Sequence, residues 1–490
     1  MIATLGILAI AAHHGGEAAL LAVVAVPVAL GMVGIVLAKL FCRPRSRARS
    51  QARWTWWHTL WFLIFASALV FRIRSVNQID TNPLDAWALY RVGLELIVGG
   101  ILLIRLALRR PPWLGGMFRG FVGMLTLFSL VCLASSVWSV FPAWTFYKSC
   151  EYLLDLALLA AILETVSSPE TYESLFNWTW AFYGTLLLSA WLDVAIWPKL
   201  ALYPSGFKIG VLGVRLTGVL PAVSADDVGV YAAILGLVAL CRLLPIDGER
   251  RARAWYLLLL TASMVTMVLS QTRAAIAGFL FGLFLLVVFS KRLRLGAASL
   301  LLLVPMVLIT PIGGALWTYL KRGENANQIS TLSSRLVWWS FAWHKFMQRP
   351  LLGFGAYAAG RFAVLAKMGM GYTSSLHSDF LGVIVGTGIW GLIPFLAALL
   401  GIWWFLTRFL RRSRTKGREQ QLAYEAITVL GVLSLNSLFL PMLTWQASLY
   451  FLVIVGYAEF LRRRQAAVSV LNVRARQILY PGVTLHDATP

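Results

Sequence analysis

The sequence predicts an all-α polytopic membrane protein with about 12 to 13 transmembrane helices and one large periplasmic loop. Of its 490 residues, 59% are hydrophobic and only 13% are charged, and the mean hydropathy is +0.76. Soluble proteins carry about 25% charged residues and fewer apolar ones. Long apolar stretches recur along the chain, and clusters of Lys and Arg separate them at alternate connections. This pattern excludes an ordinary cytosolic or secreted globular protein.

Thirteen apolar stretches are long enough to cross a bilayer, which takes about 17 to 25 residues. The region from 379 to 410 is long enough to hold a short surface helix followed by a span. In chain order, the stretches lie at residues 17–40, 56–72, 88–108, 119–140, 146–164, 174–197, 226–244, 254–270, 274–290, 295–312, 380–408, 422–440 and 446–461.

Basic loops orient these spans. The chain has 43 Lys and Arg against 20 Asp and Glu, which gives a formal charge of +23. In a membrane protein such an excess is retained in short cytoplasmic loops, so we expect no nucleic-acid partner. If every stretch spans the bilayer, the clusters all fall on the cytoplasmic side. They lie at residues 43–53, 109–119, 250–253, 291–294, 408–418 and 462–464.

This orientation divides the chain into five parts. Residues 1–55 hold an extra N-terminal membrane helix and a basic cytoplasmic loop, and residues 465–490 form a cytoplasmic tail. Two groups of core helices, at 56–312 and 378–464, flank a long periplasmic loop at 313–377. Such a connection is far longer than is usual in a compact bundle, so we expect it to carry function.

Arg273 and Arg215 are candidate anion-binding residues on the noncytoplasmic face. Arg273 ends a short break at 270–273 between two spans, where Ser or Thr can cap the next helix. A cation at the N-terminus of a helix, beside free backbone N–H groups, suits a phosphate. Arg215 lies in a glycine-containing loop at 213–218. The alternative is that these arginines contact lipid headgroups or loop carbonyls.

Arg335 opens an aromatic stretch in the long loop. Trp338, Trp339, Phe341 and Trp343 follow it. As a helix this stretch would be amphipathic, and Trp-rich amphipathic helices commonly lie at a bilayer interface. An interfacial anchor and a surface on which glycans stack both remain open.

His377 closes the long loop just before a glycine-containing span. Of the six histidines it is the only one at the mouth of a span and flanked by hydroxyl side chains. Its unperturbed pKa near 6.5 suits proton exchange near neutrality. The alternative is a structural histidine with its hydrogen bonds satisfied.

Motifs for nucleotide and metal chemistry are absent from the sequence. There is no P-loop, no GxGxxG after a strand and no HExxH. The four cysteines lie far apart, without a CxxC pair. We therefore expect no cofactor and no metal. Acidic residues are rare inside the spans, in contrast to many ion-coupled transporters.

Residues 335–392 resemble the signature region of the O-antigen ligase and O-antigen polymerase superfamily. In that family a His followed by Asn, Ser or Gln precedes a Gly-x-x-Gly element after a nine-residue gap. His377-Ser378 and Gly388-Ile389-Trp390-Gly391 have this spacing. Residues 270–274 are similar to the family's Ser/Thr-Arg element, and residues 214–218 to its upstream Arg loop. The resemblance covers about residues 56–461.

The resemblance implies a role for each of these residues. Arg215, Arg273 and Arg335 would hold the pyrophosphate of an undecaprenyl-linked glycan, and His377 would orient or deprotonate the acceptor hydroxyl. Two features depart from the family: the apolar stretch at 20–40 is an addition, and Ser follows the His where Asn is frequent. Supporting or acceptor-side residues would be Ser378, Arg361 and Trp339.

The leading interpretation is a metal-independent O-antigen ligase in the bacterial inner membrane, with its active site facing the periplasm. Its partners would be an undecaprenyl-pyrophosphate-linked glycan, the lipid A core of lipopolysaccharide as acceptor, and membrane lipids. The alternative is a polymerase of O-antigen or exopolysaccharide, whose acceptor is a second lipid-linked glycan. A flippase or transporter of lipid-linked oligosaccharides would instead need cations along a path across the bilayer. Arginines at bilayer depth cost about 2.5 to 3.5 kcal/mol each, so several together favour a binding role.

Overall fold

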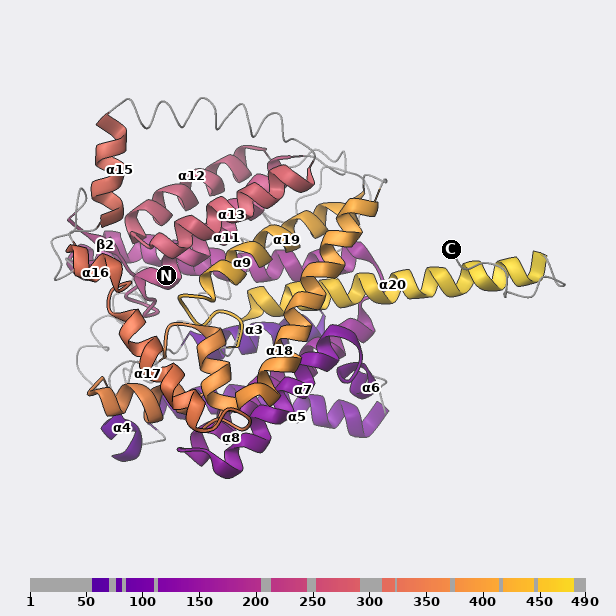
Figure 1. Ribbon diagram of the computed structural model, residues 1–490. Coiled ribbons are helices and arrows are strands. Elements are labelled where there is room, and N and C mark those ends of the chain that lie inside the picture. Colours follow the sequence, from indigo (N-terminus) through magenta and orange to yellow (C-terminus); the bar gives the residue numbers. More distant parts are fainter. Residues whose placement is uncertain are drawn as a thin grey trace.

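The computed structural model describes residues 55–69, 76–81, 85–109, 113–203, 213–244, 253–290, 311–321, 324–370, 375–413, 417–444 and 448–479 (Figure 1). Three predicted features lie outside these residues: the first apolar stretch at 17–40, most of the stretch at 295–312, and the end of the C-terminal tail after 479.

The protein is an all-α polytopic membrane protein. Its first half contains α3 (Trp56–Ala68), α4 (Val76–Thr81), α5 (Ala86–Arg109), α6 (Trp113–Met117), α7 (Gly120–Ala134), η1 (Ser135–Trp138), α8 (Pro142–Thr165), α9 (Pro169–Ile196), α10 (Pro198–Ala201) and the two short antiparallel strands β1 (Leu202–Tyr203) and β2 (Arg215–Leu216). Its second half contains α11 (Ala225–Leu243), α12 (Arg253–Ser270), α13 (Arg273–Phe289), α15 (Pro311–Lys321), α16 (Ala326–Ser330), α17 (Arg335–Gln348), η2 (Ala359–Leu365), η3 (Ala366–Met368), α18 (Asp379–Arg412), α19 (Arg418–Asn436) and α20 (Leu449–Leu479).

Four helical segments of the described chain are long and apolar enough to cross a membrane. They are Gly120–Trp138, Pro169–Ile196, Arg253–Ser270 and Asp379–Arg412, and the apolar helix Arg273–Phe289 is slightly shorter. All of them coincide with predicted stretches. Helices α3, α5, α8, α11, α19 and α20 also lie at predicted stretches. Large apolar side chains are exposed on outer faces, such as Leu103 of α5 and Leu400 of α18, as expected where a helix faces lipid.

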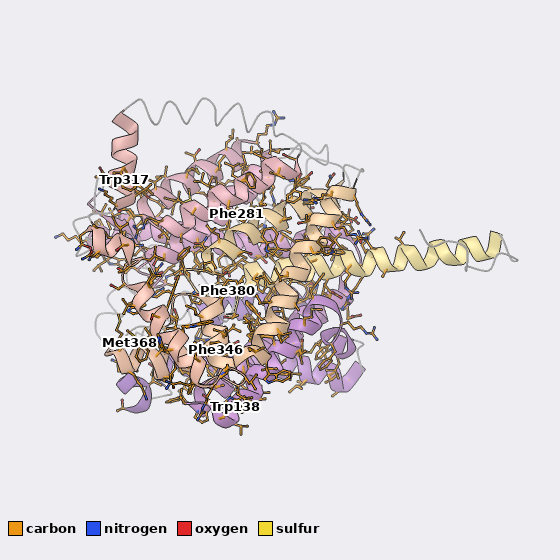
Figure 2. All side chains as sticks on the ribbon, in the orientation of Figure 1. Trp138, Phe281, Trp317, Phe346, Met368 and Phe380 are labelled. Carbon is orange, nitrogen blue, oxygen red and sulfur yellow. The ribbon has the colours of Figure 1, made fainter. Side chains whose placement is uncertain are left out.

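The helices pack into one bundle in which α18 joins two sides. Helix α11 packs along α12, α13 packs along α19, and α18 packs along α7 and against α19 (Figure 1). Side chains fill the spaces between the ribbons, and Trp317 of α15 lies at the outer edge (Figure 2). Helix α18 therefore connects the C-terminal helices to α7.

Helix α18 is broken at Gly388, where φ is 62° and ψ is −156°. The break is tied to the long loop, because the Ile389 N–H donates to the Pro350 carbonyl at 2.9 Å. A side chain at position 388 would collide with the carbonyl of Leu351, and positive φ favours glycine. The expected short helix followed by a span is thus present, and glycine is required at the joint.

The region predicted as a long loop is largely helical. Helices α15, α16, α17 and η2 occupy it. They gather at one end of the bundle, whereas the C-terminal half of α20 projects from the opposite end (Figure 1). The end that carries α15 to α17 also carries the candidate site described below.

A buried ion pair joins helices at the other half of the bundle. The Arg242 guanidinium donates from Nε to Glu425 Oε1 at 2.8 Å and from Nη2 to Oε2 at 3.0 Å. Its Nη1 donates to Asn177 Oδ1 at 2.7 Å. Arg242 and Glu425 are 2% and 1% exposed, so α9, α11 and α19 meet at a single bidentate contact.

We expect Glu425→Ala to destabilise the protein by about 3 to 5 kcal/mol, because it leaves Arg242 buried without its counter-ion. Thermal unfolding in detergent, followed by size-exclusion chromatography after heating, measures the loss. The control is Glu419→Ala, whose pair with Arg464 at 3.0 Å is partly exposed and is worth less than about 1 kcal/mol. Equal losses in the two variants would contradict the argument.

Candidate functional site

Arg215 is held at the end of the bundle by a small antiparallel pairing. It lies in β2, opposite Tyr203 of β1. Its guanidinium donates from Nη2 to Asp226 Oδ1 at 2.6 Å and from Nε to the Ser270 carbonyl at 2.9 Å. Asp226 lies in the first turn of α11. Arg215 is therefore already paired with a carboxylate and is fixed to the end of α12.

Arg273 is the first residue of α13, which begins one residue before the predicted start at 274. The preceding Thr272 is the N-cap, but its hydroxyl makes no capping bond. It donates instead to the Ala225 carbonyl at 3.1 Å or to Asp226 Oδ1 at 3.2 Å. The expected Ser or Thr cap is thus wrong at this helix, because the hydroxyl is used to join α13 to α11. The N-terminus of α13 keeps its backbone N–H groups without a side-chain cap.

Arg273 also reaches the long loop. Its Nη2 donates to both carboxylate oxygens of Glu324, at 3.0 and 2.9 Å, and to Ser333 Oγ at 3.3 Å. Its Nη1 donates to the Leu320 carbonyl at 3.3 Å. Glu324 is largely buried, with its side chain 8% exposed. The Arg273–Glu324 pair therefore fastens the segment between α15 and α17 to the start of α13.

Arg335 differs from the other two arginines because it has no hydrogen-bond or ion-pair partner among the described residues. It begins α17 directly after Leu332, Ser333 and Ser334, which all have positive φ. Within the ranges that the structure describes, no acceptor forms a hydrogen bond or ion pair with its half-buried guanidinium.

The pKa of Arg335 reveals the charges around it. Burial lowers this pKa, and the positive charges of Arg273 and Arg215 lower it further, whereas the carboxylates of Asp226 and Glu324 raise it. The three arginines and two carboxylates therefore share one region. Three cations against two carboxylates leave one positive charge without a counter-ion.

His377 lies in the same region, directly before α18, with φ of 53°. The ring of Trp338 lies 5.9 Å from its ring, centroid to centroid. The pKa of His377 is lowered to about 4, first by burial and then by the charge of Arg335, while the charge of Asp226 acts in the opposite direction. Its Nδ1 is buried without a hydrogen-bond partner among the described residues. At neutral pH the imidazole is therefore uncharged.

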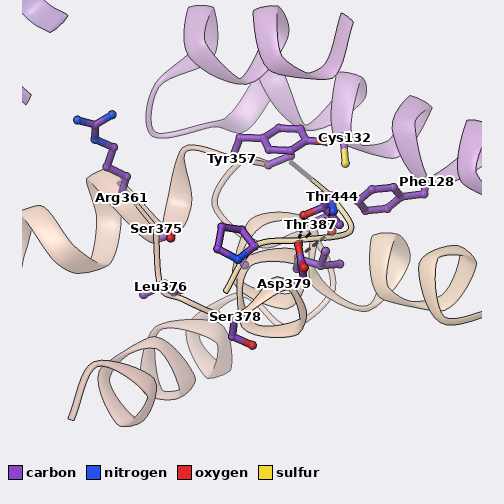
Figure 3. A pocket seen from close by; sticks show the side chains of 15 residues that line it. Phe128, Cys132, Tyr357, Arg361, Ser375, Leu376, Ser378, Asp379, Thr387 and Thr444 are labelled. Carbon is purple, nitrogen blue, oxygen red and sulfur yellow. Dashed lines mark hydrogen bonds between the residues drawn. The ribbon is translucent and has the colours of Figure 1, made fainter. Parts of the chain in front are cut away.

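The three supporting candidates occupy different places. The Trp339 indole N–H donates to the Leu376 carbonyl at 3.0 Å, beside His377. Ser378 is the N-cap of α18, and its hydroxyl accepts weakly from the Leu381 N–H at 3.5 Å. Arg361, in η2, lies over the rings of Trp144 at 5.7 Å and Phe362 at 5.6 Å. Its guanidinium points away from the centre of the nearby cavity (Figure 3).

That cavity lies between α7, η2, α18 and the segment after α19. It is lined on one side by Ser375, Leu376, Ser378 and Asp379, the residues that flank His377. Phe128, Cys132 and Tyr357 line the opposite side (Figure 3). Arg215, Arg273 and Arg335 are not among the residues that line this cavity.

Sequence analysis missed the two carboxylates that pair with the arginines. Asp226 stands next to Asp227 at the start of α11, and nothing in the sequence links it to Arg215. Glu324 is a lone acid in the long loop and gave no signal. Among the described residues no group of three or more His, Cys, Asp or Glu side chains could hold a metal ion. Asp226 and Glu324 instead serve as counter-ions.

Residues 255–396 match the family model described as O-Antigen ligase. The chain therefore contains an O-antigen ligase domain in this segment. The matched segment carries Arg273, Arg335 and His377, whereas Arg215 lies before it. The comparison with curated proteins gives no match. The protein is accordingly a membrane enzyme of the ligase and polymerase type.

We expect Glu324→Gln to strengthen the binding of an anionic ligand, because it removes a negative charge that competes for Arg273. An ion pair this close to solvent is worth up to about 1 kcal/mol, so the gain is up to about fivefold. Calorimetric titration of the detergent-solubilised protein with inorganic pyrophosphate measures it. Glu419→Gln, remote from the site, should leave the affinity unchanged. Weaker binding by Glu324→Gln would mean that Glu324 holds Arg273 in its binding position.

Proposed function

We propose that the protein is an O-antigen ligase of the bacterial inner membrane, and that it transfers a glycan from undecaprenyl pyrophosphate to the lipid A core on the periplasmic side. The observation that carries this proposal is Arg335, a half-buried cation without a hydrogen-bond partner among the described residues. It lies near a neutral His377 and two further arginines. A desolvated guanidinium with unused donors is suited to a phosphate oxygen.

The arginines account for the departure of the lipid pyrophosphate. In the proposed reaction an acceptor hydroxyl oxygen attacks the anomeric carbon of the donor sugar, and the bond from that carbon to the phosphate oxygen breaks. The pyrophosphate then carries an additional negative charge. Arg335 would bind it first, and Arg273 and Arg215 would exchange part of their contacts with Glu324 and Asp226 for phosphate oxygens. Fixed cations aimed at developing charge commonly lower the barrier.

We propose that this chemistry needs no metal. The support comes from the donor set, because the two carboxylates nearest the arginines are each bonded to a guanidinium, Asp226 to Arg215 and Glu324 to Arg273. Neither is free to join a metal-binding group. The arginines thus take the place that a divalent cation has in other transferases of phosphate-linked sugars.

His377 would accept the proton of the acceptor hydroxyl. Its pKa of about 4 keeps it uncharged, so its free nitrogen can take a proton. A base with so low a pKa is weak, but a bound pyrophosphate would raise the pKa by placing negative charge beside the ring. Donor binding would therefore make His377 a stronger base only when the donor is in place for the acceptor to attack.

Reconstitution tests the proposal. Purified protein is incubated with an undecaprenyl-pyrophosphate glycan, with and without lipid A core and without added metal, and the products are separated on gels and weighed by mass spectrometry. Core-linked glycan is the expected product. A ladder of longer lipid-linked chains from donor alone would identify a polymerase, and no new glycosidic bond would favour a transporter.

In this assay we expect His377→Ala to lose transfer by about 10²-fold or more, as is typical when a general base is removed. Donor binding, measured by titration with the lipid-linked glycan, should stay within about twofold. His344→Ala, on the exposed side of α17, is the matched control. Transfer by His377→Ala at the wild-type rate would mean that His377 is not the base.

The pH dependence of kcat/KM reports the protonation of the free enzyme. Because the pKa of His377 lies below its ordinary value, activity should persist through pH 6.5 and fall only as pH approaches about 4. Arg335→Gln removes a positive charge beside the ring, so the acidic limb should move to higher pH while the rate falls at all pH values. Two results would contradict the role of His377 as the base. One is a wild-type kcat/KM that already falls at pH 6.5, and the other is an acidic limb that moves to lower pH in Arg335→Gln.

A further inference from the structure

We propose that Asp379 is the positioning residue that orients His377, because it fastens the start of α18 to the segment between α19 and α20. It rests on the proposed function only where it predicts a change in kcat, which requires that His377 is the base. Its structural basis is a set of contacts that the sequence motif does not contain.

The Asp379 carboxylate accepts four hydrogen bonds from three consecutive residues. Oδ2 accepts from the backbone N–H groups of Met442 at 2.6 Å and Leu443 at 2.8 Å. Oδ1 accepts from the Thr444 N–H at 3.1 Å and its hydroxyl at 2.5 Å (Figure 3). The backbone N–H of Asp379 itself donates to the Ser437 carbonyl at 2.9 Å. Five contacts therefore fix this residue to the α19–α20 connection.

These contacts are strong because of where they lie. Asp379 is only 1% exposed, and hydrogen bonds from N–H groups to an ionised carboxylate are about twice as strong as neutral ones. The donors converge on the carboxylate from one short segment, so removing them would leave a buried charge with little compensation. The carboxylate thus serves as a rigid attachment point.

The orientation of His377 follows from this attachment. Its Nδ1 makes no hydrogen bond in the described part of the chain, so that nitrogen does not hold the ring in place. The backbone is held on both sides: Leu376 by the Trp339 indole and Asp379 by residues 442–444. Between these points His377 has a φ of 53°, a conformation that a non-glycine residue keeps only when its surroundings enforce it.

A similar device on the other side of the site offers a comparison. The Asp193 carboxylate accepts from the backbone N–H groups of Val219 at 2.7 Å and Leu220 at 3.1 Å. It holds the loop that follows Arg215, on the donor side. If both carboxylates position their neighbours, Asp379 should affect the chemical step and Asp193 should affect donor binding.

Steady-state kinetics of transfer separates these effects. We expect Asp379→Asn to lower kcat by about 10²-fold, the usual result of a displacement of about 1 Å, with the donor KM within about twofold. Asp193→Asn should raise the donor KM about fivefold with little change in kcat. Thr444→Val, which removes one of the four bonds, should lower kcat about threefold. Asp85→Asn, a carboxylate that accepts from the Ala88 N–H at the start of α5, is the control and should leave both constants unchanged.

A measurement on the resting protein does not depend on transfer. Carbon-13 at the Cε1 of the six histidines gives NMR signals in detergent, and the His377 signal is identified by its loss in His377→Ala. We expect its titration in Asp379→Asn to move from about pH 4 toward 6.5, because the ring becomes exposed to water. In Thr444→Val the titration of the His377 signal should move less, in the same direction. This variant provides the test if Asp379→Asn does not fold.

The outcomes distinguish this inference from the proposed function. Wild-type kcat and an unchanged His377 signal in Asp379→Asn, with His377→Ala inactive, would overturn the positioning role and leave the function standing. If the His377 signal is displaced in Asp379→Asn but His377→Ala still transfers glycan normally, the positioning role of Asp379 is supported and the catalytic role of His377 is overturned. An Asp379→Asn variant that raises KM alone would also overturn the positioning role.

Discussion

The cost of keeping charge away from water governs how this protein is built. Inside the bundle, Arg242 is held by Glu425 through two hydrogen bonds. At the candidate site, Asp226 and Glu324 each hold an arginine. Arg335 is the exception among these cations, with no hydrogen-bond partner in the described chain. An unpaired charge that is shielded from water costs stability, which is why Arg335 is the residue on which the proposed donor binding rests.

The paired arginines give the site a second property. Their counter-ions hold the guanidinium groups in place before any ligand arrives, and fixed dipoles or charges need little reorganisation when charge develops. The counter-ions come from different elements: Asp226 from α11 and Glu324 from the segment before α16. The site therefore depends on the whole bundle, including Arg215, which lies outside the segment that matches the O-antigen ligase family.

The sequence predicted the fold class, most described spans and the positions of Arg273 and His377 at helix starts, because hydropathy and helix signals are local. It did not predict which hydroxyl or carboxylate would meet which arginine. Thr272 was expected to cap α13, yet its hydroxyl contacts α11, and Glu324 carried no recognisable signal. Such pairings join residues about 50 positions apart, so only the packed bundle determines them.

The break at Gly388 divides α18 into two mechanical parts. Residues 379–387 are fastened to the α19–α20 connection and, beside the break, Ile389 is fastened to the long loop. Residues 389–412 form the longer, lipid-facing part, with Leu400 62% exposed. Because the two parts meet at a break and not in one continuous helix, the direction of the longer, membrane-crossing part does not set the direction of the segment beside the histidine.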